Sequence, residues 1–213
     1  MSQSVISVED LTMAYGSVLI QQDLSFSVNQ GDIFIIMGGS GCGKSTLLRH
    51  MIGLLNPVKG DIRFGGQSLV LADSLQRQQL IKKFGVLFQT GGLLSSLTLG
   101  ENISLPLTES TKLSAGKIRE IVRYKLALVG LAGFEDYYPL QLSGGMQKRA
   151  GLARAMALDP EILFFDEPSA GLDPVTSKHL DDLILRLRES LETTIVIVTH
   201  ELSSIFAIGN NGI

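Results

Sequence analysis

Hydrophobic positions follow two different patterns along this chain. In the first thirty residues apolar and polar side chains alternate, at residues 5–8 and 24–28, as is typical of half-buried strands. Turn residues near Tyr15-Gly16 and at 29–31 predict that these strands run antiparallel. Residues 33–37 form a continuous apolar run instead, Ile-Phe-Ile-Ile-Met, which predicts a strand buried on both faces.

Later segments repeat the buried-strand signal and alternate it with helical patterns. Short apolar runs occupy residues 84–88, 162–165 and 194–198, and a helix is expected between Lys44 and the turn at 56–60. Strand, helix and strand in succession indicate a parallel sheet with crossover connections. Before the last strand, apolar side chains recur at helical spacing at Leu180, Leu183, Ile184, Leu187 and Leu191.

This alternation predicts an α/β fold in a single domain of 213 residues. Residues 1–90 and 158–213 are expected to form a core, with a parallel sheet and a small antiparallel β part. The intervening residues, about 91–157, carry no strong strand signal and are expected to form an α-helical subdomain.

The amino-acid composition excludes some classes of function. A net charge of −3 and a pI near 5.6 argue against a general nucleic-acid binder. The single cysteine, Cys42, excludes an internal disulfide and fits a reducing cytosol. The sequence contains no apolar run long enough to cross a bilayer and no signal-peptide pattern. Any membrane association is therefore expected to come through a partner.

A phosphate-binding loop is the first chemical motif. The segment Gly-Gly-Ser-Gly-Cys-Gly-Lys-Ser fits G-x-x-x-x-G-K-S and lies between the buried strand and the helix. Glycines let backbone N–H groups turn towards phosphate oxygens, Lys44 can bridge the β- and γ-phosphates, and Ser45 can ligate Mg²⁺. A glycine-rich turn without function is the alternative, and Cys42 there is read as an incidental small residue. The predicted nucleotide-binding residues of this loop are Gly38, Gly39, Ser40, Gly41, Cys42, Gly43, Lys44, Ser45 and Thr46.

Two adjacent acids end the strand at 162–165. Asp166 is expected to anchor Mg²⁺, and Glu167 to act as the general base that activates a water molecule. A solvated strand end is the alternative. Because the carboxyl ends of parallel strands gather at one crevice, these acids and the phosphate-binding loop are expected to meet there.

Three further side chains are candidates on weaker local grounds. His200 follows the last buried strand and can donate a hydrogen bond to the γ-phosphate, although a lone His is more often structural. Gln89 follows the strand at 84–88, where its amide can touch Mg²⁺ or the attacking water, or can simply open a surface loop. Tyr15 can stack on an adenine ring, or can be a partly buried turn residue.

A second anion cradle stands about a hundred residues after the first. Ser143, Gly144 and Gly145 come at the start of a basic, helix-forming stretch, where backbone N–H groups and a hydroxyl face outwards. One small domain has no need of two cradles. The interpretation that best explains both is that the second cradle serves a neighbouring copy of the chain.

Taken together, these motifs resemble the ATP-binding cassette (ABC) ATPases along almost the whole chain. The resemblance implies a head-to-tail homodimer with two sandwiched ATP molecules and Mg²⁺, in which Ser143, Gly144 and Gly145 bind the γ-phosphate held by the other copy. It also implies that Asp173 crosses the interface and that the helical subdomain docks onto integral membrane permease subunits. In chain order the motifs are Tyr15, the loop at 38–45, Gln89, Leu142-Ser143-Gly144-Gly145, Asp166-Glu167, Ser169-Ala170-Gly171-Leu172-Asp173 and His200.

A finer resemblance is to the ATPases of MCE-type phospholipid transporters. It rests on residues 88–94, 97–103 and 142–150, on Asp-Glu-Pro-Ser-Ala-Gly-Leu-Asp-Pro at 166–174, and on Met146, where most ABC ATPases carry Gln. It implies a peripheral subunit on the cytoplasmic side of the inner membrane, with an MCE-type lipid-binding subunit and a small cytoplasmic regulator as further partners. An ATPase of another importer or exporter, an ABC protein unconnected with transport, and a nucleotide-binding scaffold are the alternatives.

Two departures from the family pattern remain. Gly39 replaces a frequent Pro, with little expected consequence. Family members usually continue beyond the switch His with further strands and a tail, whereas this sequence stops at residue 213. We therefore expect at least one edge strand to be missing, through truncation or natural shortening, with every catalytic motif retained.

Overall fold

A long β-hairpin opens the fold. The computed structural model describes residues 4–39 and 41–213, and in it β1 (Ser4–Tyr15) pairs antiparallel with β2 (Val18–Asn29). The expected antiparallel strands are confirmed and are longer than the alternating segments indicated. Two further strands, β4 (Lys59–Phe64) and β5 (Gln67–Ser68), extend this sheet in the order β2-β1-β4-β5.

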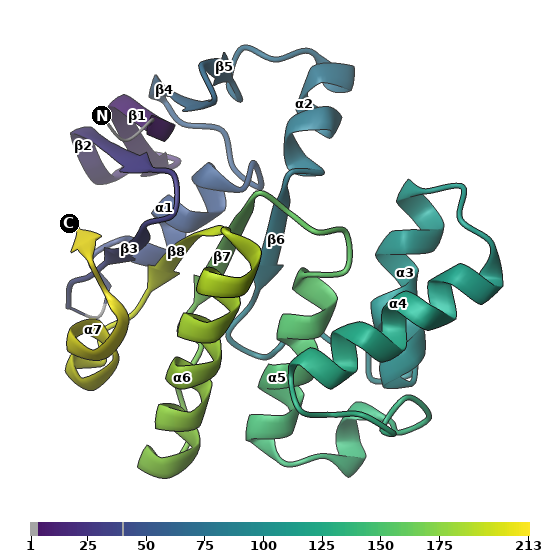
Figure 1. The fold of residues 1–213 in the computed structure, drawn as a ribbon. Helices are drawn as coiled ribbons and strands as arrows, with labels where there is room; N and C mark the ends of the chain where they lie inside the picture. The colour runs from purple at the N-terminus through teal and green to yellow at the C-terminus, as the bar shows by residue number, and fades with distance from the viewer. Residues whose placement is uncertain (1–3, 40) are drawn as a thin grey trace.

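The expected parallel sheet is the centre of the molecule (Figure 1). Its order is β6-β7-β8-β3-β9, and all residues of β3 and β8 are buried, which explains why those segments are apolar throughout. The short final strand pairs with β3 at the edge of the sheet. The five strands are β3 (Ile33–Ile36), β6 (Phe84–Leu87), β7 (Ile162–Asp166), β8 (Thr194–Val198) and β9 (Asn211–Gly212).

Each face of the parallel sheet packs into its own core, because successive side chains of a strand point to opposite faces. One core joins Phe34 and Phe164 to the antiparallel sheet and to α1 (Lys44–Met51). The other joins Ile35 and Phe165 to α6 (Pro174–Leu191), α7 (Leu202–Ile208) and the helices of the middle segment. The periodic leucines expected on a helix before the last strand all lie on α6.

The middle segment is helical, as its pattern indicated, and forms a lobe beside β6 (Figure 1). A capping box between Thr98 and Glu101 fixes the start of its first helix. The last helix packs so closely on β6 that a Cβ atom at Gly85 would overlap the carbonyl of Ala155. The lobe comprises α3 (Leu99–Ser110), α4 (Ala115–Leu128), η1 (Pro139–Gln141) and α5 (Gly144–Ala155), while α2 (Ser74–Ile81) lies nearer the antiparallel sheet.

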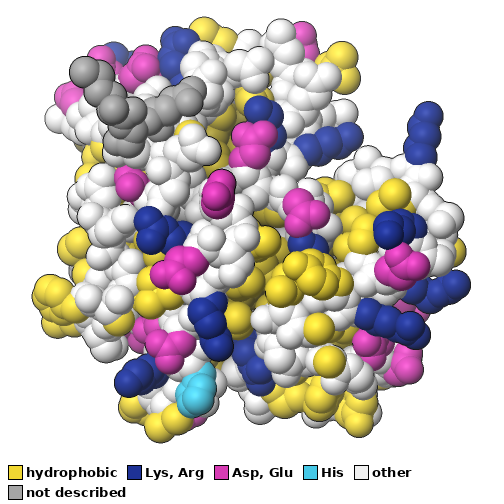
Figure 2. All heavy atoms as spheres, in the orientation of Figure 1, with side chains coloured by type: hydrophobic (Ala, Val, Ile, Leu, Met, Phe, Trp, Pro, Cys, Tyr) yellow, Lys and Arg dark blue, Asp and Glu magenta, His cyan; other side chains and the backbone are white. Residues whose placement is uncertain are grey.

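Within residues 4–39 and 41–213, no helix combines the length and the apolar composition that a bilayer crossing requires. Acidic and basic side chains are interspersed on the face seen in Figure 2, without one large region of either sign.

Candidate functional site

The glycines of the phosphate-binding loop adopt backbone conformations that other residues rarely take. Gly38, Gly41 and Gly43 have φ angles of 152°, 81° and 101°. Gly43 is also the N-cap of α1, and a Cβ atom there would lie 2.7 Å from Cγ2 of Ile20. The loop therefore needs glycine for both its curvature and its close packing. It presents the N-terminus of α1, a site that favours anions.

Lys44 holds this loop together from inside. Its side chain is buried, and Nζ donates hydrogen bonds to the carbonyl oxygens of Gly38 and Gly39 at 2.8 and 2.9 Å. The ammonium group is thus already enclosed by the loop that is expected to bind phosphate. The prediction for Ser40 lies outside the described residues.

Ser45 and Asp166 connect the loop to the parallel sheet. The Ser45 hydroxyl, in the first turn of α1, donates to Oδ1 of Asp166 at the end of β7, 3.1 Å away. Burial raises the pKa of the Asp166 carboxyl above its usual range, and the Ser45 hydrogen bond opposes this shift. A cation that relieved the buried negative charge would be stabilised here.

The oxygen donors suit Mg²⁺ in particular. Among the described residues there is no group of three or more His, Cys, Asp or Glu side chains arranged to hold a metal. Magnesium in nucleotide sites is usually bound by one or two protein oxygens together with phosphate oxygens and water. Ser45 and Asp166 match that sparse donor set.

Glu167 is the most unusual residue of the site. Its φ angle is 48°, a left-handed conformation that costs a non-glycine residue about 1–3 kcal/mol and is often found at functional sites. The backbone N–H donates to the carbonyl of Val198 on β8 at 2.8 Å, which holds the strained turn in place. The carboxylate is buried, and Oε2 has no hydrogen-bond partner among the described residues.

His200 approaches the other oxygen of this carboxylate. Nδ1 of His200 donates to Oε1 of Glu167 at 2.7 Å, while 62% of the His200 side chain remains exposed. The bond fixes the direction of the carboxylate, and His200 lines the same cleft as Glu167.

These groups surround one open cleft of about 380 Å³. The expected meeting of loop, acids and strand-end residues is therefore observed within one chain. The residues that line the cleft are Ile20, Gly41, Gly43, Lys44, Ser45, Thr46, Gln89, Glu167 and His200. Tyr15 lies beside this cleft, where Thr46 and Arg49 lower the pKa of its phenol.

Two residues of this region were not anticipated. Lys148, buried on α5, donates to the main-chain carbonyls of Gln89 and Glu167 and so connects the helical lobe to two strand ends. Burial lowers the pKa of this lysine. Ile20, on β2, forms an apolar wall. Neither role could be predicted from the neighbouring sequence, because Lys148 lies in a basic stretch and Ile20 in an ordinary alternating strand.

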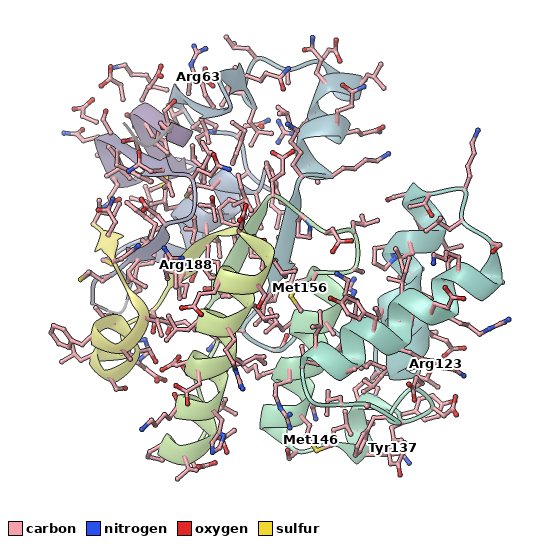
Figure 3. The ribbon with its side chains drawn as sticks, viewed as in Figure 1. Arg63, Arg123, Tyr137, Met146, Met156 and Arg188 are labelled. Atoms are coloured by element: carbon pink, nitrogen blue, oxygen red, sulfur yellow. The ribbon has the colours of Figure 1, made fainter. Side chains whose placement is uncertain are left out.

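The second cradle does not join this cleft. Ser143 is the N-cap of α5, and its hydroxyl accepts a hydrogen bond from the N–H of Met146 at 3.3 Å. Gly144 follows on the exposed side, and Gly145 is buried against α6, where a Cβ atom would overlap Cγ2 of Thr176. Met146, in the first turn of α5, is partly buried against the core beside the helical lobe (Figure 3).

Asp173 also has a clear role within its own chain. It is the N-cap of α6, where Oδ1 accepts hydrogen bonds from the N–H groups of Val175 and Thr176, both at 3.0 Å. The Thr176 hydroxyl binds Oδ2 at 2.5 Å, and these bonds lower the pKa of Asp173. Like Ser143, this residue is exposed and does not line the cleft.

The fold and the site define an ABC cassette, and the comparisons with known proteins agree. The sequence model of the ABC transporter family matches residues 21–170, so the chain belongs to this family. CbiO1 from Clostridium perfringens, part of the ABC transporter complex CbiONQ, superimposes with a TM-score of 0.89, at 28% identity, over 99% of this chain and 84% of its own. The dimeric bacterial ABC transporter cassette MJ0796 gives 0.87 at 30% identity, over 95% and 90%.

Particular relatives are more similar in sequence. The "Probable ribonucleotide transport ATP-binding protein mkl" of Mycobacterium tuberculosis is 43% identical over 97% of this chain. The "Intermembrane phospholipid transport system ATP-binding protein MlaF" is 40% identical in Haemophilus influenzae and 38% in Escherichia coli, over 99% of this chain. The chain spans 57% of the mycobacterial relative and 80% of MlaF. The expected likeness to ABC ATPases, and to those of phospholipid transporters, is confirmed.

Proposed function

We propose that this chain is the ATP-binding and ATP-hydrolysing motor subunit of an ABC transporter. The observation that carries the proposal is the single cleft in which Lys44, Ser45, Glu167 and His200 meet. Nucleotide binding requires Lys44 to exchange the carbonyls of Gly38 and Gly39 for phosphate oxygens, while the turned glycine N–H groups and the start of α1 hold the remaining charge.

Ser45 and Asp166 would hold Mg²⁺, with Gln89, which lines the cleft, as a further oxygen donor. Bound there, the cation neutralises charge on the phosphate oxygens. The desolvated Asp166 carboxylate and the Ser45 hydroxyl supply the protein's part of that site.

Glu167 is the general base in this proposal. Oε2 is buried and has no hydrogen-bond partner in the described chain, while His200 holds Oε1. Oε2 is therefore the oxygen that would accept a proton from the attacking water once nucleotide and water reach it. Lys148 fixes the main chain of both Gln89 and Glu167 and is therefore a positioning residue. The left-handed backbone of Glu167 stands directly after β7, where its side chain lines the cleft.

The complete site takes two copies of the chain. Ser143, Gly144, Gly145 and Asp173 are absent from the lining of the cleft, which supports a head-to-tail homodimer where they reach the nucleotide held by the other copy. The dimeric state of the related cassette MJ0796 supports the same arrangement. Tyr15 would stack on the adenine ring, and the interaction of its phenol with Thr46, which lines the cleft, supports this role.

Phospholipids moved between the inner and outer membranes are the proposed cargo. The MlaF proteins, whose name states intermembrane phospholipid transport, support this assignment. The subunit would bind integral membrane permeases, an MCE-type lipid-binding subunit and a small cytoplasmic regulator at the cytoplasmic face of the inner membrane. Ribonucleotide transport is the second candidate, because the Mkl relatives carry that name at 43% identity.

ATP binding and turnover by the purified chain test the motor assignment. Lys44→Ala is expected to abolish saturable ATP binding, because the loop loses its only described buried cation. Lys178→Ala, an exposed lysine outside the cleft, should bind ATP as the parent does. Equal ATP binding by all three proteins would refute the assignment. Co-purification from membranes, with mass spectrometry of the bound lipids and nucleotides, then distinguishes the two cargoes.

A further inference from the structure

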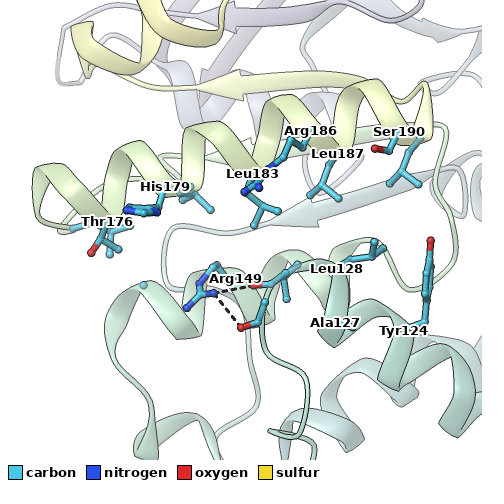
Figure 4. A pocket seen from close by; sticks show the side chains of 16 residues that line it. Tyr124, Ala127, Leu128, Arg149, Thr176, His179, Leu183, Arg186, Leu187 and Ser190 are labelled. Atoms are coloured by element: carbon cyan, nitrogen blue, oxygen red, sulfur yellow. Dashed lines mark hydrogen bonds between the residues drawn. The ribbon is translucent and has the colours of Figure 1, made fainter.

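A second cleft, of about 620 Å³, separates α6 from the helical lobe (Figure 4). It shares no described lining residue with the nucleotide cleft. The surface is hollowed here, with basic side chains along the edge (Figure 2). A concave, mainly apolar cleft of this size with a few polar groups is typical of a small-molecule site.

The cleft is long and follows one helix. It begins at Thr176, where Gly145 of α5 packs against α6, and continues to Leu191. The distance along α6 from Thr176 to Leu191 is about 22 Å at the helical rise of 1.5 Å per residue. A shape of this kind suits a single extended chain better than a compact ring. The apolar lining consists mainly of leucines: Leu128, Leu172, Leu180, Leu183, Leu187 and Leu191.

Cationic side chains stand on both walls of this cleft. Arg149 comes from α5 and Arg186 from α6, on opposite sides (Figure 4), and His179 lies on α6 as well. None of the described lining residues is an Asp or a Glu. Within the described chain, none of these three side chains forms a salt bridge. The described lining therefore carries two guanidinium groups and no carboxylate, which favours an anion.

The arginines are differently held. Arg149 is fixed at the end of α4, where Nη1 donates to the carbonyls of Val129 and Gly130 at 2.9 and 3.3 Å. This leaves its other N–H donors available. Arg186 is exposed, and its Nε donates a hydrogen bond to the Asp182 carbonyl at 3.2 Å. One anchored and one adaptable guanidinium on facing walls suit a terminal carboxylate.

We propose that this cleft binds a single-chain fatty carboxylate, with its alkyl chain along the leucines of α6 and its head group between Arg149 and Arg186. Such a ligand contacts α5, which begins beside Ser143, and α6, which begins beside Asp173. Its site thus bridges the helical lobe and the core. The proposal does not depend on ATP hydrolysis, because the cleft shares no described lining residue with the nucleotide cleft of its own chain. Gly145, which is proposed to reach the nucleotide of the other copy, lines only one end of it.

Calorimetric titration of the whole chain with dodecanoate, below its micelle concentration and without nucleotide, is the direct test. Dodecanol serves as the uncharged matched probe. Saturable binding of one dodecanoate per chain is expected, with weaker binding of dodecanol. Arg186→Glu is expected to weaken dodecanoate binding about fivefold or more, because an exposed attraction becomes a repulsion. The same variant should leave dodecanol binding unchanged.

A charge control and a choice of two cleft-filling variants complete the test. Lys178→Glu makes the same charge change on the same helix but outside the cleft, and should leave dodecanoate binding unchanged. Ala127→Trp is expected to fill the cleft from α4 and to weaken binding of both probes about tenfold or more. Circular dichroism checks folding, and Ser190→Trp fills the cleft from α6 if the first variant is unfolded.

Several results would overturn the proposal. These are the absence of saturable dodecanoate binding, equal losses for Lys178→Glu and Arg186→Glu, and unchanged binding in a folded cleft-filling variant. Binding to phosphatidylglycerol vesicles without binding of dodecanoate would also overturn it, in favour of a membrane surface. Persistence of dodecanoate binding in Lys44→Ala would separate this site from the nucleotide cleft.

Discussion

His200 Nδ1 lies 2.7 Å from Glu167 Oε1, while the second oxygen of the same carboxylate has no hydrogen-bond partner in the described chain. One oxygen is therefore oriented by His200, and the other is buried without a described partner. This asymmetry suits a base whose direction is fixed by a neighbour that does not itself take the proton.

The first prediction concerns this bond. His200→Ala should lower the kcat for ATP hydrolysis about 10–100-fold, since hydrogen bonds to charged groups contribute about 1.5–3 kcal/mol. The affinity for ATP should change much less, because the phosphate-binding loop is untouched. Steady-state kinetics separate the two effects. His179→Ala removes an exposed histidine on α6 and should keep the parent kcat; an unchanged kcat in His200→Ala would argue against the orienting role.

Gly145 provides a second prediction, about stability. Gly145→Ala should destabilise the fold by about 1–3 kcal/mol, because the new methyl group meets Cγ2 of Thr176. Gly144→Ala should have a smaller effect, since its Cβ would lie 3.7 Å from Leu172, at ordinary contact distance. Urea unfolding measures both.

Relief of the clash gives the matching control. Thr176→Ser removes Cγ2 and keeps the hydroxyl that binds Asp173. Combined with Gly145→Ala, it should restore most of the lost stability. If the double variant remains as unstable as Gly145→Ala alone, the close packing of α5 on α6 is not the reason for this glycine.

The pKa shifts of two aspartates predict opposite pH effects on stability. Burial raises the folded-state pKa of Asp166, so its carboxylate lowers stability as the pH rises from the unfolded pKa through the folded one. Asp166→Asn should therefore gain stability, relative to the parent, on going from low to neutral pH without nucleotide. The hydrogen bonds that Asp173 accepts as N-cap lower its folded-state pKa, so its carboxylate adds stability as the pH rises. Asp173→Asn should therefore lose stability, relative to the parent, on going from low to neutral pH.

Urea unfolding at about pH 3 and pH 7 brackets the usual range of carboxyl pKa values. Trends of the same sign for the two variants would contradict the roles given to burial at Asp166 and to capping at Asp173.

Much of this architecture was predictable because strong signals are local. The uninterrupted apolar runs at β3 and β8 predict strands buried on both faces. The spacing of the glycines, lysine and serine in the phosphate loop is specific for phosphate binding, and the structure shows the left-handed φ angles that several of these glycines adopt. Parallel order then places the loop, Gln89, Glu167 and His200 at one edge of the sheet.

What escaped prediction depends on distant partners. The strand β4 begins in a segment that looks like a turn, and it forms because β1 offers a partner edge. Lys148 acquires its role only when α5 reaches the carbonyls of Gln89 and Glu167. The sequence around Gly145 indicates only an anion-binding glycine, and its close packing against Thr176 becomes visible only in the structure. Contacts of this kind leave no periodicity in the sequence.

ATP turnover by Glu167→Gln, measured beside Glu201→Gln, tests the central claim most directly. Glu201 is a neighbouring glutamate that does not line the cleft, and its substitution should leave turnover unchanged. Glu167→Gln should lower turnover about 10²–10⁴-fold, because the free oxygen of the base is lost. It should also retain bound ATP and elute as a dimer. Turnover by Glu167→Gln at the parent rate would contradict the assignment of Glu167 as the base.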